Sequence, residues 1–314
     1  MTTFAELPAL STGERHTWDL FGREDELGCM NFIDRATIVA AAREIKTGQV
    51  VSLNLPLNEP QPQFWADRAP MRHTHVIRRN IRDDYVDGFQ MQGSTQWDGL
   101  RHQRYREFGW FGGRTEAELD RGELGIERWS ERGIFGRGVL VDVAGYLSAR
   151  EEPLAPDKRF GIDDSMLDAV LSAQGTELRG GEILLVRTGW LGWYLSIDQS
   201  DREIMAGALS RDRSKIELPG LAPTREVAAW LFDHRIAGVA MDNPTLDTVP
   251  YRPEEGWAHL RLIPLLGMAL GELWLLDPLA LVCATELRHS FFLSSAPLNL
   301  PGGAGSPANA YAVL

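Results

Sequence analysis

The segment from residue 92 to residue 102 combines side chains that could carry out catalysis. It has the sequence Q-G-S-T-Q-W-D-G-L-R-H. Asp98 can bind a cation or orient a base, and His102 is suited to proton transfer because imidazole titrates near neutral pH. Gln92 and Gln96 carry neutral amides, which are poor zinc ligands but good hydrogen-bonding groups. Both glutamines could therefore bind the substrate or stabilise an oxyanion, with Trp97 beside them, or they could mark a site that has lost its ligands.

Two further candidate residues lie closer to the C-terminus. Glu272 lies in an apolar stretch, where an unpaired carboxylate is costly to bury, so it needs a metal, His259 or an arginine as partner. His259 is flanked by Trp257 and Leu260, a setting in which a single histidine is more often a hydrogen-bonded core residue than a ligand. Asp98 likewise has a simpler interpretation, as the N-cap of a helix beginning at the next residue.

Other residues allow two interpretations each. His73 and His75 have a spacing that places both rings on one face of a strand, where they could form a metal pair, although so short a pattern often arises by chance. The aromatic side chains of Trp97, Trp110 and Phe111 either form the wall of a pocket for a planar substrate or fill the core.

Helices and strands must position these residues, and the sequence pattern predicts both. Together they indicate a mixed α/β fold in a single domain, residues 1–314. Asp34 is the predicted N-cap of the first helix, and Gly48 lies just past its end. Short apolar runs bounded by glycine are typical of central strands. The segment from 61 to 111 is predicted to be rich in loops, and 260–283 to be buried core. The predicted helices are 35–45, 165–173 and 224–234, and the predicted strands are 50–55, 139–143, 183–186 and 236–240.

Composition limits the classes of partner. The 44 acidic residues outnumber the 32 lysines and arginines, giving a formal charge of −12, which should repel nucleic acid and anionic membranes. Cys29 and Cys283 are the only cysteines, which excludes a disulfide framework and suits a reducing compartment. The N-terminal residues show no secretory signal, so we expect a cytoplasmic protein with a small-molecule substrate.

Several segments together resemble one known family. They occur in the order expected for that family between about residues 18 and 309, and they are Gly22–Asn31, Leu185–Trp190, Ala240–Asn243, Ala258–Leu260, Leu270–Leu273 and Gly303–Asn309. Together with the 92–102 segment, they resemble the longer-chain branch of the cyclase family, which includes the bacterial kynurenine formamidase-like, metal-dependent amide hydrolases. In the family's motif H-x-G-T-H-x-D-x-x-x-H, Asp98 and His102 are in register, whereas Gln92 and Gln96 replace two ligand histidines.

The resemblance implies a fold, a site and a reaction. The implied fold is a mixed β-sheet or barrel-like core flanked by helices, assembled as a homodimer or homotetramer. The ligands that remain, Asp98, His259 and Glu272, imply one divalent metal per chain, Zn²⁺ or Mn²⁺. The metal would activate water or polarise a carbonyl, and His102 would act as general base and then acid. The expected reaction is hydrolysis of an amide, lactam or ester.

Two alternatives remain open at this point. A metal-free enzyme of the same fold could use His102 with Asp98 or Glu272 in a cyclisation, elimination or hydration, in secondary metabolism. A non-catalytic relative could bind a small ligand. The sequence contains no G-x-S-x-G elbow, H-E-x-x-H motif, P-loop or dinucleotide-binding G-x-G-x-x-G, which argues against serine hydrolases, zincins, kinases and dehydrogenases.

Overall fold

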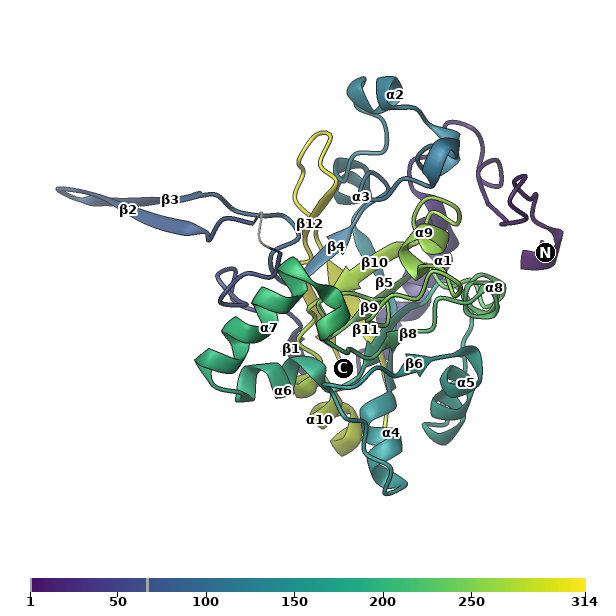
Figure 1. Ribbon diagram of the computed structural model, residues 1–314. Coiled ribbons are helices and arrows are strands. Elements are labelled where there is room, and N and C mark those ends of the chain that lie inside the picture. Colours follow the sequence, from purple (N-terminus) through teal and green to yellow (C-terminus); the bar gives the residue numbers. More distant parts are fainter. Residues whose placement is uncertain (1, 66–67) are drawn as a thin grey trace.

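A mixed β-sheet forms the centre of the protein in a computed structural model, which describes residues 2–65 and 68–314 (Figure 1). Within these residues nine strands pair in the order β1-β13-β11-β5-β7-β9-β10-β4-β12. Neighbours in the series β5-β7-β9-β10 are parallel, and the other pairs are antiparallel. The strands are β1 (Val50–Ser52), β4 (Gln96–Asp98), β5 (Ile134–Asp142), β7 (Ile183–Arg187), β9 (Gly238–Met241), β10 (Ala269–Glu272), β11 (Ser290–Ser295), β12 (Gly305–Pro307) and β13 (Ala310–Val313).

Helices flank this sheet, which curls into a half-barrel, and this arrangement confirms the predicted fold class. They are α1 (Arg35–Ala41), α2 (Glu116–Asp120), α3 (Glu127–Arg132), α4 (Val143–Ala149), α5 (Asp164–Ala173), α6 (Trp190–Ser196), α7 (Gln199–Arg211), α8 (Arg225–Asp233), α9 (Ala258–Leu262) and α10 (Asp277–Glu286). Among the described residues, no helix has the length and apolar character needed to cross a bilayer.

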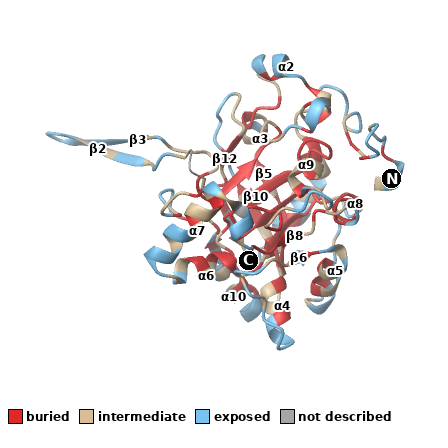
Figure 2. Cartoon of the chain, in the orientation of Figure 1, coloured by how far each residue is buried: buried red, intermediate tan, exposed pale blue. Residues whose placement is uncertain are grey.

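The central strands are buried on both faces (Figure 2). Along β7, Leu184 and Val186 pack with residues of α5 and α8, whereas Ile183 and Leu185 pack on the opposite face with residues of α3 and α10. Strands covered on both sides are apolar at every position, which explains why short apolar runs predicted them correctly. The predicted strand 139–143 falls within β5 except for Val143, which begins α4.

Side-chain caps fix the beginnings of the predicted helices. Asp34 accepts a hydrogen bond from the Thr37 amide at 2.7 Å, and Asp163 accepts one from the Met166 amide at 2.8 Å. Thr224 caps α8 in the same way. Each cap satisfies an amide that the first helical turn leaves without a partner. The first helix ends earlier than predicted, because residues 42–44 form a 3₁₀ turn.

The prediction of a loop-rich segment from 61 to 111 is wrong for its middle part. Strands β2 (Arg72–Arg78) and β3 (Ile81–Asp87) form an antiparallel hairpin that extends away from the body of the protein (Figure 1). Charged residues occupy both faces of this hairpin, so the sequence lacks the alternation that marks a half-buried strand. The remaining small sheet pairs β6 (Gly161–Ile162) with β8 (Gly220–Leu221).

Candidate active site

The pairing of β4 with β10 brings the predicted catalytic loop beside Glu272. In this antiparallel pair Gln96 lies opposite Glu272, and Asp98 lies opposite Leu270. Side chains of directly opposite residues project to the same face, and alternate residues of one strand share that face. Gln96, Asp98 and Glu272 therefore point to one side of the sheet, although 174 residues of sequence separate Asp98 from Glu272.

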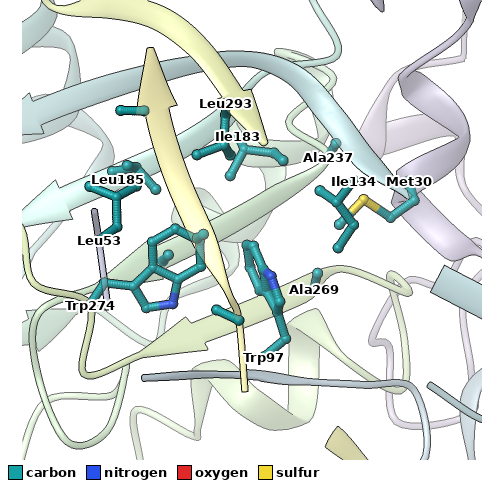
Figure 3. Close-up of a cluster of buried hydrophobic side chains, with 14 of the residues drawn as sticks. Met30, Leu53, Trp97, Ile134, Ile183, Leu185, Ala237, Ala269, Trp274 and Leu293 are labelled. Atoms are coloured by element: carbon teal, nitrogen blue, oxygen red, sulfur yellow. The ribbon is translucent and has the colours of Figure 1, made fainter. Parts of the chain in front are cut away.

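Trp97 points to the other side, and this corrects the prediction that it contacts the substrate. Its indole is fully buried in the core, with its ring centroid 4.8 Å from that of Trp274 (Figure 3). The indole N–H donates to the Ser295 hydroxyl at 2.9 Å. Gly271, opposite Trp97, makes room for this packing, because a Cβ there would lie 2.6 Å from the Trp274 indole nitrogen. The alternation of a β-strand places Trp97 away from its two polar neighbours.

His259 completes a cluster of potential metal ligands. It lies on α9, and its Nε2 is 3.1 Å from Glu272 Oε1 and 3.7 Å from Asp98 Oδ2. Ligand atoms of Asp98, His259 and Glu272 all lie within 4.8 Å of one another. The structure thus brings together the three residues that the resemblance implied as ligands. His259 is also a largely buried histidine that contacts Asp247 through Nδ1, as its simpler interpretation expected, while its Nε2 faces the two carboxylates.

Some buried oxygen atoms of this cluster receive hydrogen bonds, and others do not. Glu272 accepts a hydrogen bond from Gln96 Nε2 at 2.8 Å and one from the Leu246 amide at 3.0 Å. Asp98 is 1% exposed, yet among the described residues neither of its carboxylate oxygens receives a hydrogen bond. The Gln96 Oε1 atom is buried without a donor as well. A buried carboxylate in this state needs positive charge nearby, which protonated His102 and His259 or a metal ion can supply. The residues present therefore fit a divalent metal.

The charges in the cluster shift its titration. Burial opposes ionisation of Asp98, but His102, His259 and Arg68 outweigh it and lower the pKa of Asp98. Burial and the neighbouring Asp98 charge raise the pKa of Glu272. Burial also disfavours a charged imidazole, yet the surrounding carboxylates raise the pKa of His259 well above its ordinary value. These shifts describe a negative site that attracts positive charge, either a proton or a metal ion.

His102 lies at the edge of this cluster. Its Nδ1 is 3.4 Å from Asp98 Oδ1, and its ring centroid is 6.3 Å from that of His259. The His102 side chain is 29% exposed, so it is accessible to a ligand. The residues between Asp98 and His102 form a turn closed by a hydrogen bond from the His102 amide to the Gly99 carbonyl at 2.9 Å. No helix follows Asp98 in this described stretch, so the N-cap interpretation of Asp98 is wrong.

A pocket of about 300 Å³ opens onto these groups. Its lining combines the polar cluster with aromatic side chains, and Tyr251 and Trp257 have ring centroids 5.1 Å apart. The lining residues are Trp65, Arg68, Gln92, Gln96, His102, Gln103, Pro244, Thr245, Asp247, Tyr251, Trp257, His259 and Glu272. The Gln92 side chain lies beside Gly305. A Cβ at position 305 would lie only 2.5 Å from Gln92 Nε2. Phe111 belongs to the core and the partly buried Trp110 packs against it, which supports the second of their two interpretations.

Asp247 is the main residue that the sequence analysis missed. Its carboxylate contacts His259 Nδ1 and accepts a hydrogen bond from the Ala258 amide. A carboxylate on Nδ1 directs Nε2 of the same ring toward Asp98 and Glu272. Asp247 lies four residues after the family segment Ala240–Asn243, but no spacing rule connects it to His259. Only the packing of α9 against the segment after β9 brings the two together.

Other motif residues support the structure and lie outside the pocket. Asp242 accepts hydrogen bonds from the amides of Thr188 and Gly189 at 2.8 and 2.7 Å, which ties the end of β9 to the end of β7. Gly189 has a φ of +80°, a left-handed conformation that glycine adopts readily because it lacks a Cβ. Asp25 similarly accepts a hydrogen bond from the Gly28 amide at 2.7 Å. The Asp242 contacts thus fix strand ends, and Asp25 fixes the start of the 3₁₀ turn Gly28–Phe32.

Comparison with known proteins identifies the family. The cyclase family model, described as "Putative cyclase", matches residues 40–248, which is more than half of the chain. The chain belongs to the cyclase family. A crystal structure described as a novel cyclase shares 33% sequence identity with a TM-score of 0.83, over 95% of this chain and 97% of that one. No curated protein matches the sequence.

Two isatin hydrolases have the same cyclase fold at low sequence identity. Isatin hydrolase A from Ralstonia solanacearum shares 18% identity with a TM-score of 0.59, over 89% of this chain and 97% of that one. Isatin hydrolase A from Labrenzia aggregata, bound to benzyl benzoate, shares 16% identity with a TM-score of 0.58, over 84% of this chain and 93% of that one. At this identity the similarity shows the fold alone.

Proposed function

We propose that this protein is a metal-dependent hydrolase that opens an amide or lactam bond of a small molecule. The observation that carries this proposal is the buried Asp98 carboxylate, which has no hydrogen-bond donor among the described residues. It lies beside His259 and Glu272, and both of these residues line the pocket. The shared fold with the isatin hydrolases agrees with hydrolysis. The metal identity is part of the proposal, with Zn²⁺ or Mn²⁺ suited to one imidazole and two carboxylates.

Asp98, His259 and Glu272 would hold the ion, and two of them, His259 and Glu272, line the pocket. A bound divalent cation supplies Lewis acidity, which polarises a carbonyl and makes water easier to deprotonate. Asp247 prepares the site by holding Nδ1 of His259, so that Nε2 carries the free lone pair. A buried imidazole without this carboxylate would be free to rotate or to change tautomer.

His102 is the proposed general base and acid. Its Nδ1 lies toward Asp98, which leaves Nε2 for the contents of the pocket. In that orientation Nε2 takes a proton from the attacking water and returns it to the nitrogen of the leaving group. The partial exposure of His102 allows the ring to exchange protons with solvent between turnovers.

Gln96 favours an amide or lactam over an ester. Because its Nε2 donates to Glu272, its Oε1 is left as an acceptor without a partner. An acceptor in this position matches a substrate N–H, which an ester lacks. Gln92, which also lines the pocket, would bind the substrate carbonyl or the oxyanion formed from it.

A metal-free reaction remains the second candidate, because Glu272 has a raised pKa. A carboxylic acid that keeps its proton closer to neutral pH can act as a general acid, with His102 as the base, in a cyclisation or elimination. Such an enzyme would work without a metal ion bound to Asp98, His259 and Glu272. Metal analysis therefore separates the two functions.

The test is metal content combined with activity. After dialysis that removes weakly held ions, protein prepared without a strong chelator should keep about one Zn²⁺ or Mn²⁺ per chain. A strong chelator should abolish hydrolysis of a panel of small amides and lactams, and added metal should restore it. Asp98→Asn should lose the ion, whereas Asp163→Asn, a remote cap, should keep it. Full activity in metal-free protein would instead establish the metal-free candidate.

A further inference from the structure

The β2–β3 hairpin carries a second cluster of potential ligands, outside the pocket. The hairpin projects from the protein and is largely exposed along its length (Figures 1 and 2). A two-stranded ribbon that lacks a covering layer is only marginally stable in water. Its strands therefore benefit from any interaction that links them directly.

Three side chains meet on one face of this hairpin. His73 and His75 are two residues apart in β2, so their side chains share a face, and their ring centroids are 4.5 Å apart. His75 is paired in register with Asp84 of β3. Asp84 also reaches His73, with 2.6 Å between its Oδ2 and Nε2. One ligand atom from each of the three residues lies within 4.8 Å of the other two.

We propose that His73, His75 and Asp84 form a zinc site that links β2 to β3. Two imidazole nitrogens and a carboxylate oxygen are a ligand set that suits Zn²⁺, and water can occupy the remaining position. A tetrahedral ion with bonds of about 2.0–2.1 Å holds its ligand atoms about 3.3 Å apart. The His73–Asp84 contact must therefore open by less than about 1 Å, which exposed side chains achieve by small rotations.

This site is independent of the proposed catalytic centre. Its ligands come from β2 and β3 alone, whereas Asp98, His259 and Glu272 come from β4, α9 and β10. The exposure of all three hairpin ligands predicts exchangeable zinc, held more weakly than by a closed four-ligand structural site. Binding should make the hairpin more rigid without changing the pocket.

The experiment is a zinc titration of the intact chain in competition with a chromogenic chelator. Weakly bound metal ions are first removed from the protein. Wild-type protein should bind one more equivalent of Zn²⁺ than the H73A/H75A variant. Removal of one ligand in His75→Ala should weaken this binding by roughly 100-fold or more, beyond the 10–100-fold cost of losing a group that only orients a ligand. Thr74→Ala, on the opposite face of the same strand, is the matched control and should bind as wild type.

A gain-of-ligand variant and a local readout complete the test. Val86 lies opposite His73 on the same face, so Val86→His should add a fourth ligand and tighten zinc binding by roughly tenfold or more. Zinc should slow amide hydrogen exchange in residues 72–87 of the wild type and leave exchange in H73A/H75A unchanged. Equal zinc stoichiometry in wild type and H73A/H75A, or no effect of zinc on hairpin exchange, would overturn the proposal.

Discussion

Replacing Asp247 by Asn tests how the proposed metal ligand His259 is oriented. The Asp247 carboxylate contacts His259 Nδ1 and accepts a hydrogen bond from the Ala258 amide at the start of α9. Asparagine has nearly the same size and keeps one carbonyl oxygen, so the Ala258 hydrogen bond can persist. The substitution removes the negative charge, and its amide group can present a donor to the imidazole in place of an acceptor.

The expected magnitude follows from two separate considerations. Loss of a carboxylate that orients a metal-bound histidine costs about 10–100-fold in metal affinity or activity. A hydrogen bond involving a charged group contributes about 1.5–3 kcal/mol, which corresponds to a similar range because about 1.4 kcal/mol is tenfold. Asp247 is 2% exposed, so water screens this interaction little. We therefore expect an effect near the upper end, about 100-fold.

The assay measures metal affinity by chelator competition and measures kcat/KM on the same preparation. Both should fall together in Asp247→Asn, and the unfolding midpoint of metal-free protein measures separately the stability lost with this buried contact. Asp163→Asn provides the control, because asparagine is also a good helix cap and this position is remote from the pocket. If Asp247→Asn keeps wild-type metal affinity and wild-type turnover, the contact does not orient His259 and the reasoning is wrong.

Three further predictions concern proton transfer, the glutamines and pH. His102→Asn should lower kcat by roughly 10²–10⁴-fold with metal content unchanged, and a near-normal rate would exclude His102 as the base. Gln92→His combined with Gln96→His should raise metal content toward two ions per chain yet lower activity by about 100-fold, because the substrate loses two amide partners; retained activity would mark them as replaced ligands only. Burial raises the pKa of Asp242 to about 6, against 3.8 ordinarily, so the native state binds its proton more tightly than the unfolded state. Stability relative to Asp242→Asn should therefore fall as pH rises from about 4 to 6, by at most roughly 3 kcal/mol in denaturant unfolding, and a difference independent of pH would contradict this.

The sequence alone was sufficient for features that depend on neighbouring residues. Asp34 and Asp163 cap helices through amides three residues further along, so a local pattern identifies them. The run from Ile183 to Val186 is recognisable as a strand because a strand covered on both faces carries apolar side chains at successive positions. The order of the family motifs similarly identified Asp98, His259 and Glu272 as residues that should meet.

Only the tertiary structure decided how these residues face one another. The register of β4 against β10 places Gln96 opposite Glu272 and turns Trp97 into the core, and a shift of one residue would have reversed both. The packing of α9 supplies Asp247 to His259, a contact between residues that no periodic pattern connects. Such contacts depend on long-range pairing of strands and helices. The sequence therefore supplies the residue types of the pocket, and only the pairing of β4 with β10 and the packing of α9 bring them into one site.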